Sequence, residues 1–320
     1  MVLFHSLDDT LWHFELGAAG IHLFFTISGF VIWTSTAGRP LPPGAFLAAR
    51  VRRIVPLYWL ATLVAIASTR IVPGYFWQAT TAPANVAASL LFIPHAGISG
   101  GVFPVLYQGW TLQYEMYFYA VFAACLAVTG RYRLPVLVGW FAVMITAGAV
   151  LRPGGPLAAT YTNPISMEFV AGILVARFLP LFRGRLGPRG WAVVAGAGTA
   201  LFLWADMAEA RLSGFANLLI PLGTASVLLG LILLEEAGGL PRSRAAKLLG
   251  EASYSTYLFQ TVGFAAVAQL MPPIPVLLRV VLLVLAAHAC GLLAHRFVEK
   301  PLLTLRRTRA TAAPGPPATC

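Results

Sequence analysis

Residues 275–295 read PVLLRVVLLVLAAHACGLLAH, a stretch in which Arg279 carries the only permanent charge. A helix that crosses the hydrocarbon core of a bilayer needs about 20 mainly apolar residues, each adding about 1.5 Å to its length. The stretch therefore predicts a membrane-spanning helix. Similar apolar stretches predict further spans at residues 20–37, 54–72, 109–128, 134–151, 163–181, 190–205, 214–234 and 252–270.

The composition of the whole chain is that of a membrane protein. Of its 320 residues, 58% are hydrophobic and only 10% are charged, whereas about 25% of the residues in a soluble domain are charged. The mean hydropathy is +0.78. This composition excludes a soluble globular protein. We expect an all-α fold, a polytopic transmembrane helix bundle of about ten membrane helices.

Two further apolar segments are too short to cross a bilayer. Residues 1–7 predict the remnant of a truncated first helix, and we expect the reading frame upstream of Met1 to encode the rest of it. Residues 85–94 predict a re-entrant or interfacial segment. Proline- and glycine-rich stretches fall between the spans. One transmembrane domain is thus expected over residues 1–309, followed by a disordered cytoplasmic tail at residues 310–320.

The basic residues are distributed unevenly along this predicted topology. In a soluble protein the formal net charge of +11 would suggest a nucleic-acid partner. If the spans alternate in direction, 18 of the 22 Lys and Arg residues fall in loops on one side of the membrane. Basic residues collect in cytoplasmic loops. The topology explains the charge, so no nucleic-acid partner is expected, and the carboxyl terminus is expected in the cytoplasm.

Ionisable side chains inside a membrane are costly and are candidates for function. His5, Glu115 and Glu168 are predicted to share one depth, in the outer third of the bilayer. A histidine can deprotonate a sugar hydroxyl or accept an acyl group, and a carboxylate can orient it. The alternative is that the two carboxylates only bind neighbouring helices. The other histidines show no metal-ligand spacing and are interpreted as interfacial or packing residues, namely His13, His22, His95, His288 and His295.

A basic cluster, Arg50, Arg52 and Arg53, precedes the predicted span at residues 54–72. Arginine binds phosphate groups through two parallel hydrogen bonds, so the cluster could dock a polyanionic donor. The alternative is an ordinary cytoplasmic anchor of the helix.

At these positions the sequence resembles the acyltransferase-3 family, and most of all its exopolysaccharide-production members. The similarity runs through nearly the whole chain. The matching segments are Leu3–His5, Ile21–Phe30, Arg52–Trp59, Ser89–His95, Gly109–Glu115, Met167–Gly172, Leu249–Tyr257 and Arg296–Pro301.

The resemblance implies an enzyme of the bacterial inner membrane that transfers an acyl group from acyl-CoA, usually acetyl-CoA, to a lipid-linked or polymeric surface saccharide. It implies no bound cofactor or metal. In such enzymes the first-helix histidine is catalytic, which corresponds to His5. The basic run, here Arg50, Arg52 and Arg53, is linked to donor binding. Glu115 is the acid of the segment Gly109–Glu115. Trp110 and Tyr114 of that segment are expected to contact substrate. Glu168 is also expected to contact substrate.

Three positions depart from the family pattern. His22 stands where the family has Asp, and Gln260 stands where it has His. The family's Arg or Lys eleven residues before the catalytic histidine has no counterpart in a chain that starts four residues before His5.

Two other functions remain open from the sequence. A flippase or transporter for a lipid-linked sugar could line its path with the same polar residues, and the chain could also be a structural partner in polysaccharide synthesis. For the enzyme, thirteen residues of helix separate Glu115 from the inner end of its span, or roughly 20 Å. The donor's pantetheine arm would have to cover most of that distance.

Overall fold

The structure is a computed structural model that describes residues 19–38, 41–71, 82–97, 100–128, 130–208, 216–241, 243–270 and 275–304. Its regular structure is helical throughout these ranges, with one isolated β-bridge between Ala96 and Val102. The predicted all-α fold is confirmed. His5, the predicted helix remnant at residues 1–7 and the predicted tail at residues 310–320 lie outside the described residues.

Among the described residues, six helices are long and apolar enough to cross a membrane. They are Pro43–Thr69, Gly130–Leu151, Pro156–Phe182, Pro188–Met207, Leu218–Glu236 and Val276–Thr304. The predicted number of about ten is not confirmed. Three of the predicted spans form α2 (Ala19–Thr36), α5 (Gly109–Leu126) and α13 (Ser253–Leu270), which are not among the six. Helices α5 and α13 carry polar side chains that are buried inside the protein, such as Glu115 and Gln260.

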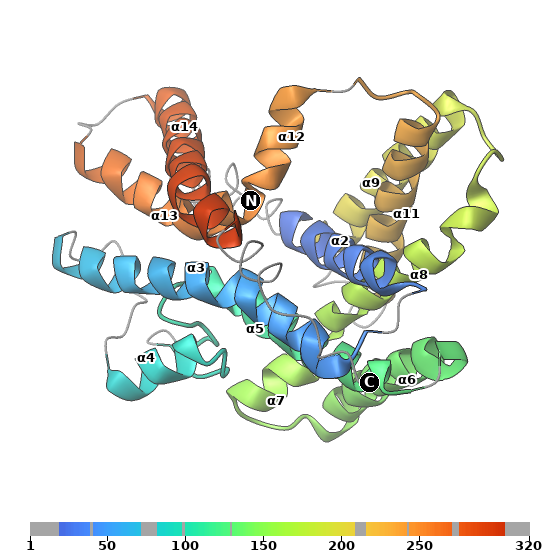
Figure 1. Ribbon diagram of the computed structural model, residues 1–320, viewed down its shortest axis with the longest axis horizontal. Coiled ribbons are helices and arrows are strands. Elements are labelled where there is room, and N and C mark those ends of the chain that lie inside the picture. Colours follow the sequence, from blue (N-terminus) through green and yellow to red (C-terminus); the bar gives the residue numbers. More distant parts are fainter. Residues whose placement is uncertain are drawn as a thin grey trace, which may run out of the picture.

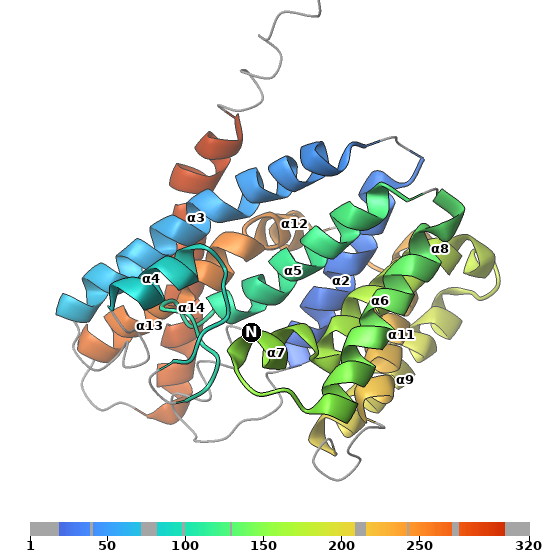
Figure 2. The ribbon, with the colours of Figure 1, turned by 90° about the horizontal axis from the view of Figure 1, so that it is seen from below.

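The helices form two groups that lie side by side (Figures 1 and 2). The first group packs around α2 and consists of α2 (Ala19–Thr36), α8 (Met167–Phe182), α9 (Pro188–Met207) and α11 (Ala216–Glu236). The second consists of α3 (Pro43–Ile71), α4 (Pro83–Leu90), α5, α13 and α14 (Val276–Ala294). The short helix α12 (Arg244–Glu251) connects the groups, and α6 (Gly130–Leu151) and α7 (Pro156–Tyr161) pack against α5. Two single turns, Pro164–Ser166 and His295–Glu299, complete the order.

Glycines allow α2 and α8 to approach each other closely. A Cβ atom at Gly172 would overlap the backbone carbonyl of Thr26, and one at Gly29 would overlap the carbonyl of Phe169. Small residues of this kind let membrane helices pack backbone against backbone. The rings of Phe118 and Phe169 stack beside this contact with centroids 4.2 Å apart. Helix α8 therefore packs directly against both α2 and α5.

Helix α3 begins at Pro43, well before the predicted span at residue 54. Arg50, Arg52 and Arg53 therefore lie within the helix, and the prediction that they precede it is wrong. The helix continues through Pro56, as membrane helices can when neighbouring groups satisfy the freed carbonyl. Arg50 and Arg53 line a cavity together with residues of α2 and α5. The segment at residues 85–94 overlaps the short helix α4, which ends at Leu90; its re-entrant or interfacial location stays a prediction.

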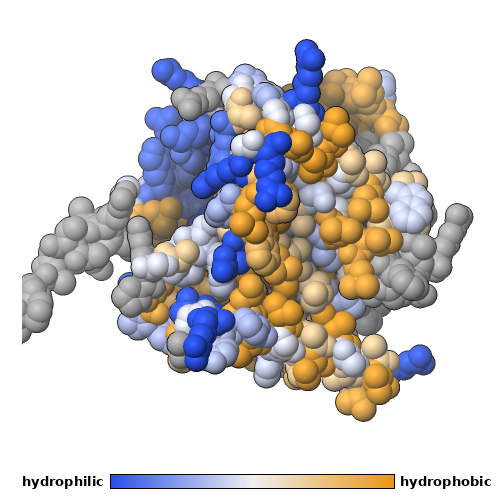
Figure 3. All heavy atoms as spheres, turned by 90° about the vertical axis from the view of Figure 1, so that its right-hand side faces the viewer, coloured by the Kyte–Doolittle hydropathy of each residue, from blue (hydrophilic) through white to orange (hydrophobic). Residues whose placement is uncertain are grey.

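Apolar side chains make up much of the outer surface of the first helix group, with hydrophilic ones scattered among them (Figure 3). Val193 and Trp204 of α9 and Leu218 and Leu222 of α11 are all more than half exposed. A soluble monomer rarely exposes large continuous apolar areas. This surface is suited to contact with lipid.

Candidate active site

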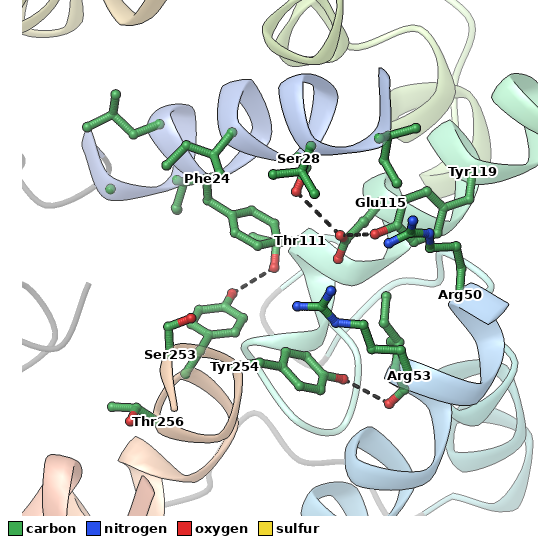
Figure 4. A pocket seen from close by; sticks show the side chains of 18 of the residues that line it. Phe24, Ser28, Arg50, Arg53, Thr111, Glu115, Tyr119, Ser253, Tyr254 and Thr256 are labelled. Carbon is green, nitrogen blue, oxygen red and sulfur yellow. Dashed lines mark hydrogen bonds between the residues drawn. The ribbon is translucent and has the colours of Figure 1, made fainter. Parts of the chain in front are cut away.

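A cavity of about 680 Å³ lies between the two helix groups. Helix α2 forms one wall, and α13 and α14 form the opposite wall. Helices α3 and α5 close it between them (Figure 4). The residues of α2 that line it include Gly20, Phe24, Ser28 and Val31, which recur every three or four positions and so share one face of the helix. From Gly20 to Ile32 the cavity follows α2 for about 18 Å.

Glu115 of α5 is the buried carboxylate of this cavity, with 5% of its surface exposed. Oε1 of Glu115 accepts a hydrogen bond from the hydroxyl of Tyr119, one helical turn further along α5. The hydroxyl of Ser28 lies 3.4 Å from the same oxygen. Glu115 is thus hydrogen-bonded both to α2 and within its own helix. A glutamine at this position could accept the same two hydrogen bonds.

Arg50 and Arg53 reach the cavity from α3, beside Glu115 (Figure 4). Nη2 of Arg50 donates to Oγ of Ser35 at 3.3 Å, and its guanidinium lies over the rings of Phe46 and Tyr119. Two guanidinium groups and one carboxylate leave a net positive charge at this end of the cavity, which suits an anion.

Two tyrosines of α13 bind this helix to α3 and to the start of α5. The hydroxyl of Tyr254 donates to the backbone carbonyl of Ile54 at 2.8 Å, and that of Tyr257 donates to the carbonyl of Gln108 at 2.8 Å. The hydroxyls of Tyr257 and Thr111 lie 2.7 Å apart. These contacts place a wall of neutral hydroxyl groups opposite α2.

The structure brings some of the expected site residues together and separates others. Glu115, Arg50 and Arg53 line the same cavity, so the arginines are not separated from Glu115 by the roughly 20 Å of helix between Glu115 and the inner end of its predicted span. The early start of α3 explains the difference. Arg52 lines a smaller recess next to Glu299. Trp110 and Tyr114 pack edge to face with each other outside the cavity, and Tyr114 also packs on Phe25.

Comparison with known proteins assigns the chain to a family. The family profile described as an acyltransferase domain, that of the acyltransferase-3 family, matches residues 1–296. The chain belongs to this family. It is an acyltransferase and a multi-pass membrane protein.

The acyltransferase is also similar to a curated bacterial protein. It is 38% identical over 325 residues to the exopolysaccharide production protein ExoZ of Rhizobium meliloti (strain 1021), and the alignment covers 98% of each chain. No solved structure matches the acyltransferase.

Glu168 of the acyltransferase lies outside the cavity, in a second buried polar cluster. Its Oε2 accepts from the hydroxyls of Thr26 at 3.0 Å and Thr224 at 2.8 Å, and its Oε1 lies 3.2 Å from Nδ1 of His22. Nε2 of His22 is 3.6 Å from Oδ1 of Asp206. His22 and Thr26 occupy the face of α2 opposite Gly20 and Phe24. The carboxylates of Glu115 and Glu168 are thus on different sides of one helix.

Glu168→Ala is expected to destabilise the acyltransferase by about 3 kcal/mol, since it leaves His22, Thr26 and Thr224 without their shared partner inside the protein. Thermal unfolding of the purified protein in detergent measures the effect. Glu251→Ala is the control, because Glu251 is exposed and its ion pair with the exposed Lys247 is long, at 3.9 Å. Equal unfolding temperatures for the Glu168→Ala protein and wild type would show that the cluster does not hold α2, α8 and α11 together.

Sequence reasoning missed several residues of the cavity. Tyr119 follows Glu115 by four positions, a spacing that places both on one helix face and could have revealed it. Ser28 and Tyr254 lay inside the quoted family segments but had no assigned role. His22 and His288 were interpreted as interfacial or packing residues, whereas His22 pairs with carboxylates and His288 lines the cavity. Within the described ranges, no three His, Cys, Asp or Glu side chains are grouped closely enough to form a metal site.

Proposed function

We propose that the acyltransferase moves an acyl group, with acetyl as the first choice, from acyl-CoA to a hydroxyl of an exopolysaccharide or its lipid-linked precursor. The observation that carries this proposal is the single cavity lined by Arg50, Arg53 and the buried Glu115. The similarity to a protein named for exopolysaccharide production supports the saccharide acceptor. Acyl-CoA serves as a co-substrate.

The shape and charge of the cavity fit the two parts of an acyl-CoA donor. Arg50 and Arg53 supply the cationic end at which phosphate groups would bind in bidentate fashion. The apolar side chains of Phe24, Ile27 and Val31 line the path along α2. A pantetheine arm laid along this path carries the acyl group away from the phosphates, past Glu115 and toward Gly20.

His5 and Glu115 are the proposed catalytic residues, as the family resemblance implies. The imidazole of His5 would accept the acyl group or a proton, and the carboxylate of Glu115 would stabilise the resulting positive charge. His5 lies outside the described residues, so the argument for its role comes from the sequence alone.

Deletion of the gene tests the proposal. Mass spectrometry of the surface polysaccharide from the deletion strain should show an unchanged amount of polymer that lacks its acyl group. The missing mass identifies that group. A strain that exports no polysaccharide, and in which the polymer precursors accumulate unaltered, would instead favour a flippase and would contradict the enzyme.

Arg53→Ala is expected to raise the KM for acyl-CoA by about 10–100-fold and to lower kcat much less, because a hydrogen bond to a charged group contributes about 1.5–3 kcal/mol. Initial rates in membrane vesicles at several acetyl-CoA concentrations measure both constants. Arg52→Ala is the matched control, since Arg52 is next in the same helix and lies outside the cavity. Equal KM values for the two variants would contradict donor binding by Arg53.

The topology is proposed from the 18-to-4 division of basic residues between the two sides of the membrane. A reporter joined after Arg309 is expected to signal a cytoplasmic location, and one inserted between Asp206 and Arg211 an external one. Alkaline phosphatase and green fluorescent protein fusions at both positions measure this. Both positions reporting the same side would contradict the proposed orientation.

A further inference from the structure

His288 is the one histidine among the described residues that lines the cavity. It lies on α14, on the wall opposite α2, and shares that wall with Ser253, Thr256 and Tyr257 of α13. Gly291, one turn further along α14, lies against Thr256, so the two helices are in direct contact at this level. An imidazole and several hydroxyl groups therefore face the same space as Glu115.

The hydrogen bond of His288 determines which ring nitrogen carries the proton. Nδ1 lies 2.8 Å from the backbone carbonyl oxygen of Val284, one turn earlier in α14. A carbonyl oxygen only accepts hydrogen bonds, so Nδ1 must carry a hydrogen. In the neutral ring the lone pair is then on Nε2, the nitrogen farther from the backbone. Nε2 has no partner among the described residues. Because His288 lines the cavity, a free lone pair on Nε2 can serve as a base for a group bound there.

Two parts of the cavity differ in charge. Arg50 and Arg53 make one end cationic and suited to phosphates. The wall of α13 and α14 carries no formal charge when His288 is neutral, and it presents hydroxyl groups and one imidazole. Such a surface can hydrogen-bond a sugar, which is rich in hydroxyl groups and uncharged. The acceptor therefore fits the His288 wall, and the donor fits the arginine end.

We propose that His288 is a further catalytic residue, the base that takes the proton from the acceptor hydroxyl. The inference rests on the proposed function. The sugar O–H bond breaks as the proton moves to Nε2 of His288, and the sugar oxygen forms a bond to the acyl carbon. The bond from that carbon to its carrier then breaks, which is the C–S bond of the thioester or, if His5 has first accepted the acyl group, the C–N bond to His5, and Nε2 returns the proton to the leaving sulfur or nitrogen. Atoms and charge balance without any other reactant.

Two substitutions separate catalysis from structure. His288→Ala removes the ring and leaves space that free imidazole can enter from the cavity. His288→Asn keeps an amide that can donate to the carbonyl of Val284 but has no basic nitrogen. Leu285→Ala is the matched control, because Leu285 is on the same helix, is 60% exposed and does not line the cavity. Each protein is assayed in vesicles with acetyl-CoA as donor and polysaccharide from the deletion strain as acceptor.

Both His288 variants are expected to transfer the acetyl group about 100-fold more slowly or worse, since general-base catalysis typically contributes 10²–10⁴-fold. The KM for acetyl-CoA should stay near that of wild type. Added imidazole should restore a large part of the rate of His288→Ala and none of the rate of His288→Asn. Leu285→Ala should match wild type.

Two results would overturn the base role of His288. One is transfer at the wild-type rate by either His288 variant. The other is a slow His288→Ala protein that accumulates normally and does not respond to imidazole. If His288→Ala fails to accumulate, wild-type transfer by His288→Asn overturns the proposal, and a slow His288→Asn protein with an unchanged KM supports it. Absence of transfer by the wild-type protein would instead contradict the proposed function itself.

Discussion

Glu115→Gln is expected to lower acyl transfer by at least about 100-fold while the protein still accumulates in the membrane. The amide is nearly the same size as the carboxylate and can still accept from Tyr119 and Ser28. It has no negative charge, so it can neither stabilise a cationic intermediate nor balance Arg50 and Arg53 in the same cavity. The initial rate of transfer from acetyl-CoA in membrane vesicles measures the effect.

A matched carboxylate outside the cavity controls for the loss of charge. Glu251→Gln on α12 removes a charge from an exposed position and is expected to transfer at the wild-type rate. Tyr119→Phe removes one donor to Glu115 and should have an intermediate effect. A Glu115→Gln protein with wild-type activity would remove Glu115 from the catalytic machinery.

Gly172→Val is expected to abolish accumulation of the folded protein. A side chain at residue 172 would overlap the backbone carbonyl of Thr26 and approach the backbone nitrogen of Phe30. Backbone atoms cannot move aside as a flexible side chain can, so α2 and α8 would have to separate. That separation would also break the ring contact between Phe25 and Phe169 and displace Ser28 from Glu115. The level of protein in membranes and its thermal unfolding in detergent measure the loss.

The control for this prediction is a glycine in a helix with free space around it. Gly139 of α6 has no atom within 4 Å of the position that a Cβ atom would occupy. Gly139→Val should therefore accumulate normally, because valine is well tolerated in the apolar environment of a membrane helix. Normal accumulation of both variants would show that the close approach of α2 and α8 is not required for folding.

The sequence predicted the all-α fold and the buried carboxylates, because apolar stretches and isolated ionisable residues are direct consequences of the bilayer as a solvent. It could not predict the angular position of a residue around the bundle. Glu115 and Glu168 were assigned to one site because depth was the only coordinate available, and the structure places them on opposite sides of α2. Angular position depends on which helices pack together, and for α2 that is decided by Gly29 and Gly172.

The arginines show a second limit of the sequence. Arg50, Arg52 and Arg53 interrupted the apolar pattern, so the predicted span started after them. The helix starts at Pro43, and Arg50 and Arg53 can lie within it because they face the cavity rather than lipid. His288 was assigned to packing for a related reason. Its apolar neighbours in α14 gave no sign of the hydroxyl groups that α13 brings beside it.

The measurement that tests the central claim most directly is acyl transfer by the purified wild-type protein in proteoliposomes. The donor is acetyl-CoA labelled in the acetyl group, and the acceptor is polysaccharide from the deletion strain. The account predicts label in the polysaccharide that is released by mild alkali, as expected of an O-acyl ester, and no label with the Glu115→Gln protein. Equal labelling by wild type and Glu115→Gln would contradict it, as would the absence of labelling by folded wild-type protein.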